Sequence, residues 1–218
     1  MFPPAAQFGL VYIIIVFSAV VHEYAHAWTA ERLGDSTAKD AGRLTLNPLK
    51  HLDLFGTVLV PLFSLAFLNI FIGWAKPVPI DTRALRGRFG ELFVAAAGPA
   101  ANVLLALLLG LAVRFVTPAQ LAQAGLGGPS GAVTLLVFAL ASYINLFIAL
   151  FNLIPLAPLD GSHILPKLLP AAAQEFLSRS LVGMLLAVFV AMALIPPVAS
   201  ALFSFITGQY GGLSGGSM

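Results

Sequence analysis

A run of 22 residues, Gly9–Ala30, is almost entirely apolar, yet it contains two histidines and a glutamate. A run of this length can cross a bilayer as a helix. Ionisable side chains cost several kcal/mol to insert at membrane depth, so they are rare there and mark a functional site. His22 and His26 are four residues apart, which places both on one face of a helix. The sequence therefore predicts a membrane-spanning helix that carries a polar site.

The polar residues of this run form the motif His22-Glu23-Tyr24-Ala25-His26, which is typical of zinc hydrolases. Two histidines on one helical face can bind the same metal ion, and Glu23 is placed to polarise a metal-bound water. A buried pair of structural histidines is the alternative interpretation. The chain has no cysteine, so its metal ligands must be His, Asp or Glu.

The composition indicates an integral membrane protein. Of the 218 residues, 59% are hydrophobic and 9% are charged, and the mean hydropathy is +0.96. The Lys and Arg residues form no basic stripe, which argues against a nucleic-acid partner. The N-terminal sequence MFPPAAQ has no Lys or Arg, so we expect the first helix to be retained and not cleaved as a signal peptide.

The fold class predicted from these patterns is an all-α polytopic membrane protein. Four apolar segments are long enough to span the bilayer, at about 9–31, 91–116, 132–154 and 178–206. Pro196 and Pro197 fall in the last segment and are expected to kink or split it. Residues 1–207 are expected to form a single membrane-embedded domain, and the Gly/Ser-rich tail 208–218 is expected to be disordered.

A fifth apolar segment, residues 55–73, decides the topology. If it spans, the 11 Lys and Arg residues divide about evenly between the two sides. If it enters and returns on the same side, ten of the 11 lie on one face, and Arg114 alone lies near the other. The positive-inside rule favours the second layout and assigns the basic face to the cytoplasm. We therefore predict a re-entrant or partly inserted segment, followed by a short extended segment near 74–80, with a fifth spanning helix as the alternative.

A catalytic zinc site needs a third protein ligand and an open position for water. The candidates are His51 and Asp53 in the loop after the first helix, and Asp160 after the third. Asp160 lies where the chain leaves the membrane through two prolines, and a carboxylate there needs a partner because lipid offers none. The first and third helices run in the same direction only if 55–73 does not cross, and Asp160 then lies on the same side as the histidine pair.

Three motifs resemble those of the site-2 proteases, which are intramembrane zinc metalloproteases. They are HEYAH at 22–26, GPxxN at 98–102, and Asn152 followed by Leu159-Asp160-Gly161. The segments 42–48 (GRLTLNP) and 73–79 (GWAKPVP) are similar to a compact prokaryotic subgroup, and the resemblance covers about residues 15–170. The chain departs from the family at Ala157, where the first of two prolines usually precedes the Leu-Asp-Gly sequence.

The resemblance implies an endopeptidase with one zinc ion held by His22, His26 and Asp160, and with Glu23 as the catalytic base. It also implies that Asn152 helps to bind or polarise the substrate, although an interhelical hydrogen bond is the alternative for this residue. The expected partners are a transmembrane protein or peptide substrate and the lipid bilayer, and the sequence predicts no oligomeric state. The expected location is the prokaryotic cytoplasmic (inner) membrane, with the active site toward the cytoplasmic side.

Two other functions use the same residues. A membrane zinc transporter or metal-sensing protein could employ the same His and Asp ligands, and a catalytically inactive relative could act as a scaffold. Transport favours ionisable residues across the whole bilayer and internal repeats, and neither is visible in this sequence. The complete set of ligands and base argues against an inactive scaffold.

Several other polar residues have less specific roles. The stretch Trp74–Pro79 is a candidate edge strand for pairing with a substrate peptide, and a loop held by its two prolines is the alternative. Asn102 is expected to be structural, next to small residues that allow close helix packing. His51 and His163 are most simply polar loop residues near the interface. The arginines of the 81–90 stretch are expected to be interfacial anchors: Arg83, Arg86 and Arg88.

Overall fold

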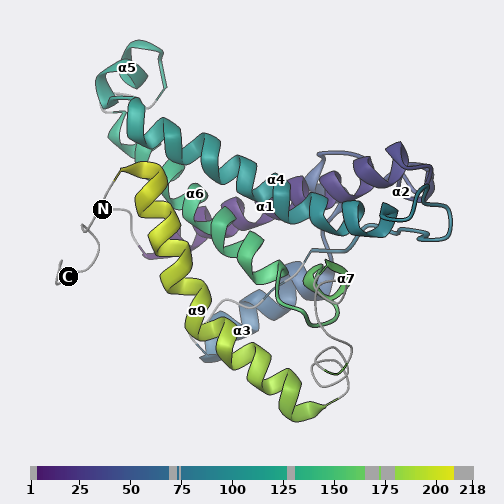
Figure 1. Ribbon diagram of the computed structural model, residues 1–218. Coiled ribbons are helices and arrows are strands. Elements are labelled where there is room, and N and C mark those ends of the chain that lie inside the picture. The colour runs from purple at the N-terminus through teal and green to yellow at the C-terminus, as the bar shows by residue number, and fades with distance from the viewer. Residues whose placement is uncertain are drawn as a thin grey trace. The chain divides into compact units, whose positions relative to one another are not determined.

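The computed structural model describes residues 4–68, 73, 75–126, 131–164, 172 and 180–208, which contain helices and irregular segments but no strand (Figure 1). The chain divides into two compact units, Met1–Ala101 and Asn102–Met218. Helix α4 contributes its first half to the first unit and its second half to the second. The single domain predicted over residues 1–207 stays a prediction, and the tail 209–218 lies outside the described residues.

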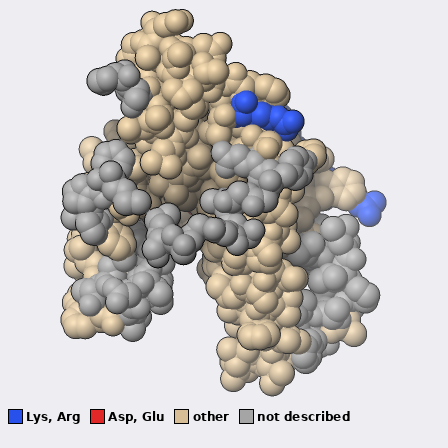
Figure 2. Space-filling model, turned by 90° about the vertical axis from the view of Figure 1, so that its left-hand side faces the viewer, with Lys and Arg blue, Asp and Glu red and all other residues tan. Residues whose placement is uncertain are grey.

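Four helices are long and apolar enough to cross a membrane. They are α1 (Pro4–Arg32), α4 (Gly90–Phe115), α6 (Ala132–Asn152) and α9 (Leu181–Thr207). Most of their large apolar side chains are exposed, as expected for surfaces that face lipid. The face drawn in Figure 2 carries Lys and Arg at only a few places and shows no acidic side chain. The structure confirms the prediction of an all-α polytopic membrane protein.

In the first unit, short helices follow α1. They are α2 (Thr37–Asp40), η1 (Pro48–Lys50), η2 (Leu54–Leu59) and α3 (Val60–Leu68). A small core joins the end of α1 to α2 and to the loops that follow it. Its buried residues are Ala27, Ala38 and Val78, and Leu44 and Ile80 pack against them. This core holds the polar loops against the helix that carries the histidine motif.

The described part of the fifth apolar segment is helical but short. Residues 54–68 form η2, a single π-helical stretch, and then α3, whereas a spanning helix needs about 20 residues. The segment is not one of the four candidate spans. Residues 69–72 and 74 lie outside the described residues, so a re-entrant path stays a prediction.

Helix η2 is tied to α1 by a side-chain hydrogen bond. The Tyr12 hydroxyl donates to the Thr57 carbonyl oxygen at 2.8 Å. Asp53 caps the helix, because its side chain accepts a hydrogen bond from the Gly56 amide at 2.7 Å. The start of the fifth apolar segment is therefore fixed against the first spanning helix.

The second unit is built on the packing of α6 against α9, together with the second half of α4. It also contains α5 (Pro118–Gln123) and α7 (Gly161–Ile164). Tyr143 and Phe203 meet edge to face, with their ring centroids 6.0 Å apart. The buried core residues are Ala106, Leu146, Ala199, Phe203 and Ile206.

Polar side chains inside this unit bond to one another and to backbone. Asn102 donates to the Asn145 side-chain oxygen at 2.7 Å, and both residues are almost fully buried. Ser142 donates to the Ala106 carbonyl oxygen at 2.8 Å. These bonds link α4 to α6, which gives Asn102 a structural role.

Of the two outcomes predicted for Pro196 and Pro197, a kink or a split of the last helix, the split does not occur. Both prolines lie inside the continuous helix α9. Each proline removes one backbone hydrogen bond, but neighbouring residues of α9 are buried against the rest of the unit. Ile195 packs against the loop after α6, and Ala199 packs in the α6–α9 core. Tertiary packing therefore keeps the helix in one piece.

The non-spanning path of 55–73 predicts that the segments before and after it are accessible from the same side. Because the chain has no cysteine, single cysteines can be introduced at exposed positions without a background signal. We expect Lys39→Cys and Arg83→Cys to react with a membrane-impermeant maleimide from one side, and Gln123→Cys to react from the other. The measurement compares intact cells with inverted membrane vesicles. Labelling of Lys39→Cys and Arg83→Cys from opposite sides would instead establish a fifth spanning helix.

Candidate active site

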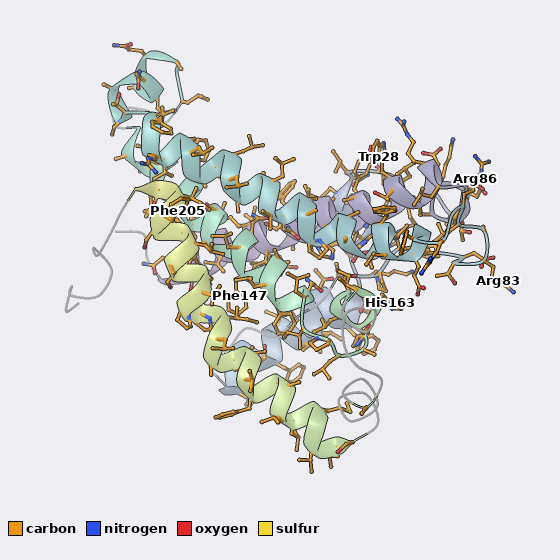
Figure 3. The ribbon with its side chains drawn as sticks, viewed as in Figure 1. Trp28, Arg83, Arg86, Phe147, His163 and Phe205 are labelled. Atoms are coloured by element: carbon orange, nitrogen blue, oxygen red, sulfur yellow. The ribbon has the colours of Figure 1, made fainter. Side chains whose placement is uncertain are left out.

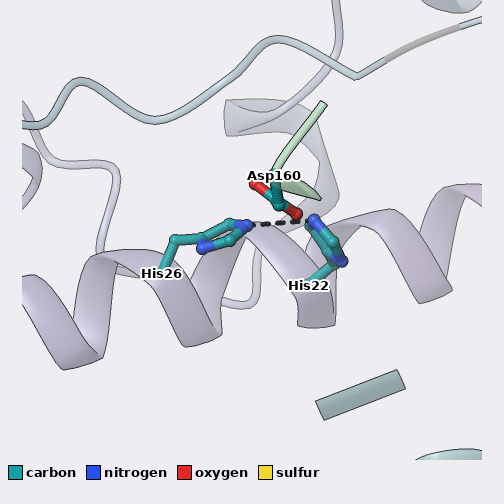
Figure 4. Close-up of side chains that lie close together, drawn as sticks. All are labelled: His22, His26 and Asp160. Carbon is teal, nitrogen blue, oxygen red and sulfur yellow. Dashed lines mark hydrogen bonds between the residues drawn. The ribbon is translucent and has the colours of Figure 1, made fainter. Parts of the chain in front are cut away.

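The two histidines of the motif face each other on successive turns of α1. Their rings meet edge to face with centroids 4.6 Å apart, and the two Nε2 atoms are 3.0 Å apart (Figure 4). Each side chain is only 6% exposed. The four-residue spacing therefore brings two imidazole nitrogens to one point, as the sequence predicted.

The tautomer of His26 is set by helix α4. His26 Nδ1 lies 2.7 Å from the Val94 carbonyl oxygen, which can only accept a hydrogen bond. Nδ1 must therefore carry the proton, and in the neutral ring the Nε2 lone pair is directed toward His22. A histidine whose Nδ1–H is bound to a backbone carbonyl is the usual arrangement in metal-binding sites, because it orients the ring and makes Nε2 a better ligand.

Gly98 leaves the space that the two imidazoles occupy. It lies four residues after Val94, so both face α1 from the same side of α4. A Cβ atom at Gly98 would lie 2.3 Å from His26 Nε2 and 2.6 Å from His22 Nε2, which no real contact allows. The glycine of the GPxxN motif therefore does more than permit close helix packing, because it makes room for the Nε2 atoms of both histidines.

Glu23 is held by the backbone of a distant loop. The Val78 amide donates to Glu23 Oε2 at 2.8 Å, and the two residues are 55 positions apart in the sequence. Val78 itself is buried in the core that joins the loops to α1. The carboxylate is thus fixed one residue from His22, with its second oxygen making no hydrogen bond among the described residues.

Sequence reasoning missed the contributions of Val78 and Val94. Both act through their backbone, so their side chains give no sign of a functional role. The position of Val78 between Pro77 and Pro79 was a usable signal, because an amide between two prolines cannot belong to a regular helix.

Asp160 belongs to the second unit, in a compact loop that follows α6. Ile154 and Leu156 are buried against α9 and anchor this loop. A Cβ atom at Gly161 would lie 2.3 Å from the Leu153 carbonyl oxygen and 2.4 Å from that of Ile154, so only glycine fits after Asp160. The Asp-Gly sequence is therefore required by the fold of the loop that presents the carboxylate.

The remaining polar candidates differ from one another. The Asn152 side-chain amide donates to the Ile148 carbonyl oxygen of its own helix at 3.0 Å. His163 is exposed, but it lies in the short helix α7 and not in a loop as the sequence predicted. His51, by contrast, is 1% exposed, and its Nε2 lies 2.9 Å from the Thr45 carbonyl oxygen. His51 lies in the turn after η1, as expected for a loop residue, and its Nδ1 is buried without a hydrogen-bond partner among the described residues. Its place near the membrane interface stays a prediction.

Comparison with known proteins places the chain in a family. The model of peptidase family M50 matches residues 118–196. The chain is 35% identical over 184 residues to a protein of Bacillus subtilis named "Putative zinc metalloprotease YwhC", covering 83% of this chain and 78% of that protein. The chain belongs to peptidase family M50, the site-2 proteases.

Mycobacterial proteins give the same result. The chain is 32% identical over 206 residues to "Putative zinc metalloprotease Rip2" of Mycolicibacterium smegmatis, covering 92% of this chain and 73% of that protein. It is 30% identical over 161 residues to the Mycobacterium tuberculosis protein of the same name, covering 72% and 58% respectively. No solved structure matches the chain.

As a site-2 protease, the chain is a zinc metalloendopeptidase and an integral membrane protein. This identification supports the protease interpretation over a zinc transporter or a scaffold. The family model matches a stretch of the chain that contains Asn152 and Asp160. The Bacillus protein and the two mycobacterial proteins match most of the chain's length.

The polar end of α1 and the loops beyond it carry exposed arginines. Arg83 and Arg86 project away from the helices at this end (Figure 3). Arg83 forms an exposed ion pair with Asp81 at 3.0 Å, and its guanidinium lowers the pKa of the Asp81 carboxyl group. Such exposed pairs contribute little stability, which is compatible with an interfacial position.

Gly98→Ala is expected to disrupt metal binding by this site-2 protease. The added methyl group would clash with both Nε2 atoms and displace at least one ring, so we expect metal content to fall about ten-fold or more. Gly9→Ala on α1 is the matched control, because a Cβ atom there meets nothing within 4 Å. Metal analysis of the purified proteins measures the effect, and full metal content in Gly98→Ala would contradict it.

Proposed function

We propose that this zinc metalloendopeptidase hydrolyses peptide bonds within or near transmembrane segments of membrane proteins. The observation that carries the proposal is the depth of the histidine pair in a spanning helix. His26 and His22 lie six and ten residues before Arg32 at the end of α1, which is about 9 and 15 Å along the helix axis. A peptide bond that reaches this pair must itself enter the membrane region.

We propose that one zinc ion is held by His22, His26 and Asp160. Figure 4 draws these three side chains, each of which offers one ligand atom. Two neutral imidazoles and a carboxylate are suitable zinc ligands, and three protein ligands leave a fourth position for water. The bond from His26 to Val94 and the space at Gly98 both suit a metal at the two Nε2 atoms.

We assign Glu23 the role of general base. Bound zinc supplies a Lewis acid that lowers the pKa of water and polarises the scissile carbonyl group. The Val78 amide uses Oε2 of Glu23, which leaves Oε1 to accept the proton from water and return it to the leaving amine. Asn152 can stabilise the developing oxyanion once its amide turns from the Ile148 carbonyl oxygen toward the substrate.

The substrate must present an unwound backbone. A helix hides its carbonyl groups in hydrogen bonds, so a transmembrane substrate has to open locally before hydrolysis. The 75–79 loop is poorly suited to pair with such a peptide, because its backbone is already bonded within the protein. The Lys76 amide donates to the His51 carbonyl oxygen, and the Val78 amide donates to Glu23.

We place the protein in the prokaryotic cytoplasmic membrane with its active site toward the cytoplasmic side. The excess of Lys and Arg after the first helix supports this orientation, because basic loops remain in the cytoplasm. The histidine pair lies in the half of α1 that leads into these basic loops.

Glu23→Gln is expected to abolish cleavage while zinc remains bound. The substitution keeps the shape and the acceptor for the Val78 amide but removes the base, so we expect activity to fall by about 10²–10⁴-fold. Zinc content and cleavage of a transmembrane reporter are measured on the purified proteins. Glu31→Gln is the matched control on the same helix, where Glu31 pairs with Lys39 near the surface. Normal cleavage by Glu23→Gln would refute the assignment.

Asp160→Ala is expected to release zinc. Removing one of three protein ligands should weaken zinc binding by more than about 100-fold, since loss of an outer partner alone costs about 10–100-fold. Asp81→Ala, which removes an exposed carboxylate, serves as the control. Competition with a chromogenic chelator measures the affinity. Unchanged zinc binding in Asp160→Ala would require a different third ligand.

A further inference from the structure

The base of the proposed mechanism is oriented by a segment that the sequence makes unusually rigid. Residues 76–80 read Lys-Pro-Val-Pro-Ile, and we call them the proline arm. Proline has no amide hydrogen, so the Val78 amide is the only donor between Lys76 and Ile80. Residues that precede proline are restricted to extended conformations, which applies to Lys76 and Val78. The arm therefore offers one amide in one direction, and that amide bonds Glu23.

The proline arm is fixed to the protein at Lys76. The Lys76 amide donates to the His51 carbonyl oxygen at 2.9 Å, and the Lys76 carbonyl oxygen accepts from Arg43 Nη2 at 2.8 Å. Two residues further on, Val78 is buried beside Ala27 of α1. A displacement of Lys76 would consequently move the amide that holds Glu23.

Arg43 is an unusual choice for a structural contact. Its side chain is 8% exposed, and Nε makes no hydrogen bond among the described residues. Burying a guanidinium group is costly, and a well-packed apolar side chain often stabilises a fold as well or better. An apolar residue could not donate a hydrogen bond to the Lys76 carbonyl oxygen. The burial of Arg43 at this place therefore indicates that the position of the proline arm has to be fixed.

We propose that Arg43 is a positioning residue for catalysis, acting through the proline arm on Glu23. This inference rests on the proposed role of Glu23 as the base. Arg43 holds Lys76, the two prolines transmit that position to Val78, and the Val78 amide fixes the Glu23 carboxylate. Loss of this chain of contacts leaves Glu23 present but misdirected, and a misplaced catalytic group slows the reaction without a comparable loss of substrate binding.

The test compares Arg43→Met, Arg43→Lys and the control Arg83→Met, whose arginine is 89% exposed. For Arg43→Met we expect kcat to fall about ten-fold or more, with KM changed by less than about two-fold and zinc content unchanged. Arg43→Lys retains a donor and should recover part of kcat. Arg83→Met should behave as the wild type. Normal kcat in Arg43→Met, or loss of zinc together with kcat, would overturn the positioning role.

Hydrogen–deuterium exchange gives a readout that does not depend on cleavage. A peptide that covers residues 76–80 contains only three amides, because two of its five residues are prolines. Arg43→Met should accelerate exchange in this peptide, and Glu23→Gln should leave it slow because the acceptor is kept. If the zinc-loaded wild type cleaves nothing, the proposed function fails, whereas exchange still decides whether Arg43 fixes the arm. Unchanged exchange in Arg43→Met would refute the inference.

A second pair of variants covers the case in which Arg43→Met does not fold. Val78→Pro deletes the amide that bonds Glu23, whereas Val78→Ala keeps the amide and shortens the same buried side chain. We expect Val78→Pro to lower kcat far more than Val78→Ala, with zinc bound in both. Equal kcat values for the two variants would show that the amide does not orient Glu23, and the proposal would fall.

Discussion

Lipid offers no hydrogen bonds, so each polar side chain that this protein places at membrane depth has to find a partner within the protein. Backbone carbonyl oxygens are the partners of several such side chains among the described residues. The ring of His26 bonds to Val94, the hydroxyl of Ser142 bonds to Ala106, and that of Tyr12 bonds to Thr57. A carbonyl oxygen has two lone pairs, so a helix can accept such a bond and keep its own. The helices therefore serve as hydrogen-bond partners as well as a scaffold.

The same requirement shapes the active site. On the face of helix α4 that contacts the histidines, the Val94 carbonyl group accepts a hydrogen bond, and Gly98, one turn later, leaves space because it has no side chain. The first feature sets the proton of His26, and the second leaves room for the ring nitrogens. One turn of a neighbouring helix thus orients one imidazole and leaves room for both, which suits the proposed zinc ion, without contributing any polar side chain.

The sequence predicted those features that depend on a local pattern, such as the length of an apolar run or the spacing of two residues. Four helices follow from the length of their apolar runs, and the meeting of His22 and His26 follows from their four-residue separation. The continuity of α9 through Pro196 and Pro197 depends on packing against the rest of its unit, which no local pattern encodes. The burial of His51 similarly depends on a carbonyl group six residues earlier. Val78 was missed because its contribution is a backbone amide.

The two prolines beside Val78 also act before the protein has folded. A proline restricts the unfolded chain as well as the native one, so the 76–80 segment has fewer conformations to lose when it docks against α1. A side chain that holds a catalytic group loses rotamer freedom when the protein folds, and this loss opposes folding. The donor to Glu23 is a backbone amide in a segment that is already stiff in the unfolded chain. Ordering this segment therefore costs less conformational entropy than ordering a flexible loop in the same position would cost.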